Sequence, residues 1–136
     1  MQATLKIGEL SKRTGYQVET IRFYEHEGLL PEPVRSQSNY RLYGDVHIER
    51  LHFIRRCRSL DMALDEVRTL LRLRDGPEES CDEVNLVLDG HIEQIGLRIA
   101  DLTVLQTQLV ALRSQCQAGL AVKNCGILKE LTQAIS

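Results

Sequence analysis

The sequence lacks tryptophan, and aromatic residues make up only 4% of its 136 positions. Strands draw heavily on aromatic and β-branched residues, so this scarcity favours a mainly helical protein with aliphatic packing. No apolar run approaches the ~20 residues of a membrane-spanning helix, and the first residues lack the apolar core of a signal peptide. We therefore expect a cytoplasmic protein with no membrane partner.

An excess of positive charge is also missing, because the formal net charge is −2. The average hides a division along the chain. Residues 1–75 carry 13 Lys and Arg against 11 Asp and Glu, whereas residues 76–136 carry 4 against 8. A nucleic-acid surface would therefore be sought in the first part. Charge alone favours a plainer interpretation, a solvated helical surface with salt bridges.

The first part of the chain predicts a helix-turn-helix. A short helix with Ile7 and Leu10 on one face ends near Gly15, and a second helix containing Ile21 ends near Gly28. Two short helices joined by a glycine-containing turn are typical of this motif.

A small β element and two further helices follow. Residues 40–43 alternate and are rich in tyrosine, which predicts a short strand and so a winged arrangement. Asp45 is a suitable N-cap for a third helix. A fourth helix carries the apolar residues of 64–71, and Asp75-Gly76-Pro77 ends it.

The last long element predicts a coiled coil. Ser80 and Glu83 fit a capping box at its start. Apolar residues recur every seven positions over about four heptads, at Leu88, Ile95, Leu102 and Leu109. One helix cannot bury such a seam alone. We expect dimerisation rather than packing against this chain's own short N-terminal helices.

Two cysteines belong to the same seven-residue series. Cys81 begins it and Cys116 ends it, 35 residues apart, which is ~52 Å along a straight helix. Thiolates that share one ion lie ~2.3 Å from it, with zinc as the guide. In an antiparallel dimer, Cys81 of one subunit would meet Cys116 of the other, and Cys125 could fold back as a third thiolate.

Other interpretations of the cysteines stay open at this point. Cys57 lies on an apolar helical stripe and is expected in the core. Cys81 or Cys116 alone could fill the seam, and Cys116 with Cys125 could form a disulfide or redox pair. Their joint placement favours the metal site. The four histidines show no ligand spacing to these cysteines.

Several segments together carry a family resemblance. They are Ile7–Leu10, Thr20–Glu25, Gly28–Pro31, Asn39–Tyr43, Ile54–Arg58 and Leu64–Val67. On these segments the chain resembles the mercury-resistance-regulator (MerR) family over essentially its whole length. The resemblance implies a winged helix-turn-helix over residues 1–75, a linker over 76–80, an antiparallel dimerisation helix over 81–117, and a metal-binding loop with a short helix over 118–136.

The resemblance also implies a function in transcription and no enzymatic activity. Members bind double-stranded promoter DNA as homodimers and activate transcription by RNA polymerase by deforming the promoter when the effector binds. By matching position, the expected DNA contacts are Arg22, Tyr24, Arg35, Tyr40 and Arg41, with Arg22 as the base-edge contact. For Tyr43, packing inside the wing is an equally good expectation.

The cysteines Cys81, Cys116 and Cys125 match the divalent-metal ligands of the family. Copper(I)-type members lack a counterpart of Cys81, and zinc-type members have a cysteine and a histidine where this chain has Gln117 and Leu120. Three thiolates without an evident fourth ligand suit large, soft ions. The surrounding sequence resembles the lead- and cadmium-responsive branch, so the expected effector is Pb(II), then Cd(II), with Hg(II) third.

Overall fold

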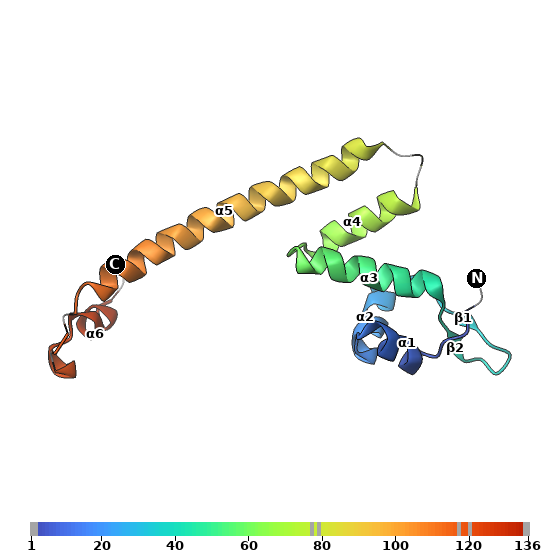
Figure 1. Ribbon diagram of the computed structural model, residues 1–136, viewed down its shortest axis with the longest axis horizontal. Coiled ribbons are helices and arrows are strands. Elements are labelled where there is room, and N and C mark those ends of the chain that lie inside the picture. The colour runs from blue at the N-terminus through green and yellow to red at the C-terminus, as the bar shows by residue number, and fades with distance from the viewer. Residues whose placement is uncertain (1–2, 77, 79, 117, 120, 135–136) are drawn as a thin grey trace. The chain divides into compact units, whose positions relative to one another are not determined.

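The structure is a computed structural model that describes residues 3–76, 78, 80–116, 118–119 and 121–134. It divides into two compact units, one up to Val87 and one from Leu88 onward. Helices dominate both units, and the described residues form a single two-stranded sheet (Figure 1). The expected mainly helical fold, with an N-terminal helix-turn-helix and a long C-terminal helix, is confirmed.

The first two helices, α1 (Ile7–Thr14) and α2 (Val18–His26), pack against each other, and α1 also contacts α3 (Asp45–Ser59). Gly15 ends α1 in the left-handed region, with φ of +80°, and its N–H donates to the Ser11 carbonyl at 2.8 Å. Leu10 and Ile21 are fully buried where the helices meet. These bounds agree with the two helices that the apolar spacing predicts.

The wing consists of two antiparallel strands, β1 (Val34–Arg35) and β2 (Arg41–Leu42), with Arg35 opposite Arg41. The backbone of Tyr43 forms a bridge with Leu5 through hydrogen bonds of 2.7 and 2.9 Å. The strand expected at residues 40–43 is therefore present. β1 was not expected, because Pro33 directly precedes it and prolines interrupt strands.

The helix α3 begins one residue earlier than its predicted cap implies. Gly44 is the N-cap, and Asp45 is the first helical residue. The Nδ1 atom of His47 accepts a hydrogen bond from the Gly44 N–H at 3.1 Å. The expectation of Asp45 as the cap is therefore wrong, and an imidazole makes the contact that a capping carboxylate often makes.

The helix α4 (Leu64–Asp75) closes the first unit against α3. Leu51 and Ile54 of α3 and Val67 of α4 are fully buried. At the end of α4, the Arg50 guanidinium donates to both carboxylate oxygens of Asp75, at 2.9 and 3.0 Å. The Nε atom of Arg50 also donates to the Leu29 carbonyl at 3.1 Å, so one buried arginine joins three segments.

The longest helix is α5 (Cys81–Arg113), and the Ser80 hydroxyl accepts a hydrogen bond from the Asp82 N–H at its start. The carboxylate of Glu83 lies 3.6 Å from the Arg72 guanidinium. The helix ends at Arg113, so Cys116 lies beyond it, whereas the sequence predicts helix to residue 117. Pro77 of the linker and residues 117 and 120 are outside the described residues.

Apolar residues occur on every side of α5, and most of the large ones are exposed in the single chain. By length and mean hydropathy, 1.3 over an 18-residue window, it is the one described helix apolar enough to cross a membrane. The prediction from the sequence did not anticipate this window. Many of the same side chains belong to the heptad series, which a partner helix would bury.

The C-terminal segment turns back after α5. A short 3-10 helix, η1 (Val122–Asn124), is followed by α6 (Gly126–Leu131), whose N-cap is Cys125. This segment belongs to the same unit as the second part of α5.

Candidate DNA interface and metal centre

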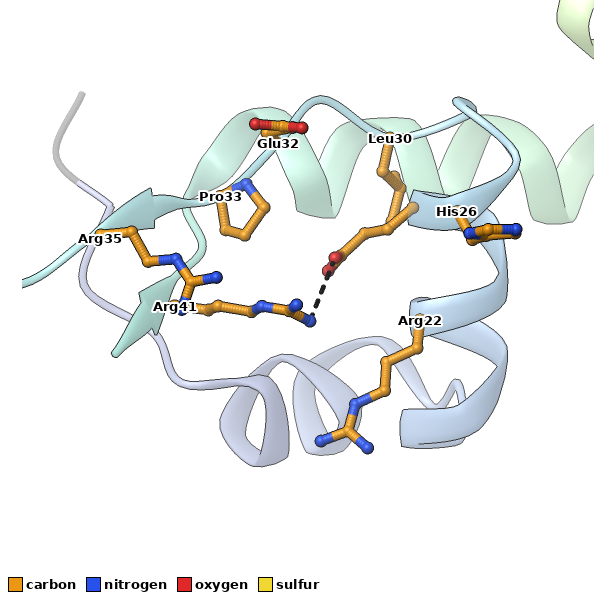
Figure 2. A pocket seen from close by; sticks show the side chains of 8 residues that line it. Arg22, His26, Leu30, Glu32, Pro33, Arg35 and Arg41 are labelled. Atoms are coloured by element: carbon orange, nitrogen blue, oxygen red, sulfur yellow. Dashed lines mark ion pairs between the residues drawn. The ribbon is translucent and has the colours of Figure 1, made fainter. Parts of the chain in front are cut away.

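Arginines from α2, the second or recognition helix of the helix-turn-helix, and from the wing line one cavity of about 350 Å³. Arg22 comes from α2, whereas Arg35 and Arg41 come from the two wing strands (Figure 2). The same three side chains line a neighbouring groove together with Lys6 and Tyr40. Four basic groups therefore meet on one face, which is the arrangement that binds phosphate oxygens.

The wing side chains are held by local contacts. Arg35 donates to the Asn39 carbonyl at 3.1 Å, and the Lys6 ammonium lies 4.7 Å from the centre of the exposed Tyr40 ring. Lys6 was not among the residues expected from the sequence. It precedes the first helix, where the apolar pattern carries no information about it.

Tyr24 differs from the other four expected DNA contacts, because it is only 7% exposed. Its ring packs edge-on against Tyr16, with centroids 5.7 Å apart. It follows Ile21 by three residues and shares the buried face of α2. The position therefore favours a structural role for Tyr24.

Tyr43 is fully buried, and its hydroxyl donates to the carboxylate of Glu25. Burial, followed by that hydrogen bond, raises the pKa of Tyr43 to about 12. Of the two expectations for Tyr43, packing inside the domain is the one that agrees with this environment.

Two of the three expected metal ligands lie side by side within one chain. The thiols of Cys116 and Cys125 lie within interaction distance of each other. The backbone N–H of Leu128 and then the neighbouring Cys116 thiol lower the pKa of Cys125, and the Cys125 thiol raises the pKa of Cys116. The pair therefore favours a thiolate on Cys125, the form that binds metals.

Gly126 sits where the loop approaches the end of α5. A Cβ atom at this position would lie 2.5 Å from the Gln115 carbonyl oxygen, which is closer than side chains approach a backbone oxygen. Glycine therefore permits the contact that brings Cys125 back beside Cys116. The role of Gly126 could not be predicted from the sequence, since a loop glycine gives no signal of what it contacts.

Cys81 is the exposed first residue of α5 and lines a cavity of about 300 Å³ in the first unit, with Phe53, Leu70 and Leu73. The 33 residues of α5 span about 50 Å at 1.5 Å per residue. Within the described part of a single chain, no three His, Cys, Asp or Glu side chains form a metal-binding group.

Cys57 is buried on α3, and burial raises the pKa of its thiol. Its place in the core agrees with the expectation from its apolar stripe. A buried, protonated thiol of this kind is unsuited to metal binding.

Comparison with known proteins identifies the family to which the chain is related. The model of the MerR HTH family regulatory proteins matches residues 5–73, and the model described as MerR, DNA binding matches residues 48–112. The chain is 44% identical over 111 residues, 82% of both chains, to the HTH-type transcriptional regulator ZntR homolog of Haemophilus influenzae. It is 36% identical to the mercuric resistance operon regulatory protein of Bacillus cereus, over 93% of this chain and 96% of that one.

A solved structure agrees with these relatives. The transcription regulator PbrR691 from Ralstonia metallidurans CH34, in complex with lead(II), is 52% identical. Its TM-score to this chain is 0.85, and the match covers 95% of this chain and all of that one. The helix-turn-helix, the long helix and the family models point to one conclusion: the chain belongs to the MerR family of helix-turn-helix transcription regulators.

Proposed function

We propose that this MerR-family regulator acts as a homodimer on double-stranded promoter DNA and activates transcription of heavy-metal resistance genes by RNA polymerase when Pb(II) binds. Cd(II) is the second candidate ion and Hg(II) the third. Residues 1–75 bind the DNA, α5 forms the dimer, and the segment after α5 holds the metal. This is a role in the cytoplasm without enzymatic activity.

The observation that carries the proposal is the neighbouring thiol pair of Cys116 and Cys125. Two thiolates leave a soft divalent ion short of ligands, and Cys81 is exposed at the start of a helix of about 50 Å. An antiparallel dimer brings Cys81 of the partner subunit to the pair. Each dimer then has two equivalent three-thiolate sites.

The choice of ion rests on ligand chemistry and on the relatives. Three sulfur ligands suit Pb(II), Cd(II) and Hg(II) better than small, hard cations. The lead(II) complex of PbrR691 supports lead first, and the mercuric resistance regulator of Bacillus cereus keeps mercury among the candidates.

Promoter binding is assigned to Arg22, Arg35, Tyr40 and Arg41, which share one face between α2 and the wing. Arg22 on the recognition helix reads a base edge, and the wing groups contact the backbone. Metal binding shifts the dimer toward a form that bends and untwists the DNA. Tyr24 supports the helix from inside the domain.

Serine substitutions test the metal site. We expect Cys81→Ser, Cys116→Ser or Cys125→Ser each to abolish lead-induced transcription in a reporter assay while promoter binding stays largely intact. Cys57→Ala is the matched control, because it removes the fourth thiol from the core and should leave induction unchanged. A Cys81→Ser protein that responds normally to lead would overturn the three-thiolate site.

Mixed dimers test whether the site is shared between subunits. A Cys81→Ser subunit paired with a Cys116→Ser subunit retains one complete site, whereas each mutant homodimer has none. We expect the mixed dimer to bind one Pb(II) tightly. Failure of the mixed dimer to bind lead would show that each site comes from a single chain.

A thiol-disulfide switch is a second candidate function, because the adjacent thiols of Cys116 and Cys125 could also be oxidised. Such a switch does not need Cys81. A reporter that responds to the thiol oxidant diamide in the Cys81→Ser variant, and not to lead in the wild type, would favour it.

A further inference from the structure

An acidic side chain lies within the basic surface assigned to DNA. Glu25 is on α2 and lines the same cavity as Arg22, Arg35 and Arg41. Its side chain is only 13% exposed. A carboxylate near phosphate groups weakens DNA binding by repulsion, so its presence there calls for a compensating role.

Both carboxylate oxygens of Glu25 contact the segment that forms and follows β2. One oxygen accepts the hydrogen bond from the Tyr43 hydroxyl, and the other lies 3.6 Å from the guanidinium of Arg41. Figure 2 marks this ion pair with a dashed line across the cavity from Arg41. Tyr43 is fully buried and its backbone is bridged to Leu5, so one end of the connection is fixed in the domain.

Through Glu25, this connection joins α2 to the wing. Arg41 retains 45% exposure of its side chain, which leaves room for a phosphate on its outer side. A half-exposed ion pair adds little to stability. The ion pair of Glu25 and Arg41 therefore acts on the position and orientation of the Arg41 guanidinium relative to Arg22.

We propose that Glu25 is a positioning residue that sets DNA specificity by holding Arg41 of the wing in register with Arg22 of the recognition helix. This inference rests on the proposed DNA interface. Binding to a specific site requires both arginines to be correctly positioned at the same time, whereas binding to nonspecific DNA requires only positive charge. Glu25 therefore weakens binding to all DNA slightly and favours the promoter over other sequences.

The test compares Glu25→Gln with Glu32→Gln. Both changes remove one negative charge from the same cavity, but Glu32 is exposed, and the described ion pair of Arg41 is with Glu25. Affinities for the promoter and for a scrambled duplex are measured at fixed salt. We expect both variants to bind scrambled DNA more tightly, and only Glu25→Gln to lower the specific-to-nonspecific ratio, by about fivefold.

A double-mutant cycle separates positioning from general destabilisation. In an Arg41→Gln background, Glu25→Gln should not lower the ratio further, because the residue that it positions is gone. An equal loss in both backgrounds would overturn the inference. So would a ratio for Glu25→Gln that equals that of Glu32→Gln.

Two further variants distinguish failure of the Glu25 inference from misfolding of one variant and from failure of the proposed DNA interface. Tyr43→Phe leaves all charges in place and removes one of the two contacts of Glu25, so it should lower the ratio in the same direction even if Glu25→Gln does not fold. An unchanged ratio for Tyr43→Phe then contradicts the inference. If Arg22→Ala also binds the promoter normally, the proposed interface itself is wrong.

Discussion

A single imidazole connects the start of α3 with the chain that enters the wing. His47 is 3% exposed; its Nδ1 atom accepts from the Gly44 N–H, and its Nε2 atom lies 3.1 Å from the Pro31 carbonyl oxygen. The neutral tautomer with the proton on Nε2 satisfies both contacts. Protonation would place a second N–H against the Gly44 donor.

The contacts of His47 predict a dependence of stability on pH. Burial lowers the pKa of His47 below 6.5, so the fold favours the neutral form. The stabilisation is present above the ordinary pKa of 6.5 and is lost as the pH falls through the lowered value. Urea unfolding at about pH 7.5 and about pH 5 should show a larger loss for the wild type than for His47→Gln. Equal losses would contradict this role.

Individual residues were predicted unevenly from the sequence, for reasons of chemistry. Cys57 and Ile21 follow the apolar spacing of their helices, so their burial could be predicted. The polar hydroxyl of Tyr24 favours a DNA contact, whereas its spacing of three from Ile21 favours the core, where its ring lies. Glu25 gives no signal, because its partners Arg41 and Tyr43 are brought to it only by the fold.

At the scale of elements, the contact between the C-terminal loop and the end of α5 depends on Gly126. In Gly126→Ala the added methyl group would collide with the Gln115 carbonyl, so Cys125 would move away from Cys116. We expect Pb(II) affinity to fall about 10- to 100-fold, as for other groups that orient metal ligands. The affinity is measured by titrating each protein with Pb(II) and following the thiolate-to-lead charge-transfer absorption.

The matched control for that change is Gly8→Ala. A Cβ atom at the exposed Gly8 would have nothing within 4 Å. Lead affinity should therefore stay at the wild-type value. Equal affinities for all three proteins would show that the close approach at Gly126 does not position the thiol.

The end of α4 depends on the ion pair of Arg50 and Asp75. Asp75→Asn leaves the mostly buried Arg50 guanidinium without its counter-charge, so the free energy of unfolding should fall by about 1–2 kcal/mol. Asp65→Asn is the control, because Asp65 pairs with Arg68 at the surface and is 94% exposed. It should change stability by less than about 0.5 kcal/mol. Chemical denaturation of both variants compares the two pairs.

The helices of the first unit could be predicted because each has an apolar stripe and a recognisable end, such as Gly15. The end of α5 could not, since the seven-residue series continues to Cys116 while the backbone leaves the helix after Arg113. The guanidinium of Arg113 donates to the Cys116 carbonyl at 3.2 Å, which satisfies an acceptor beyond the helix end. Such a contact does not change the spacing of apolar residues, so it could not be predicted from the sequence.

For the whole molecule, the heptad series predicts which face of α5 forms the dimer. Leu102 belongs to the series and Leu97 lies on the opposite face, yet their exposures in the single chain are nearly the same, at 62% and 63%. Leu102→Asp should convert the dimer to monomers in sedimentation measurements at micromolar protein, because it buries a charge in the seam. Leu97→Asp should remain dimeric. Dissociation by both would contradict the assigned seam.

The exposed apolar side chains of α5 also affect the lifetime of a newly synthesised, unassembled subunit. An isolated long helix with apolar residues on all sides is poorly protected and prone to aggregate. We expect proteases in the cell to remove such unassembled chains faster than dimers. The steady amount of regulator would then rise more steeply than its rate of synthesis, since pairing increases with the square of subunit concentration. At low expression of the gene, very little of the assembled dimer would accumulate.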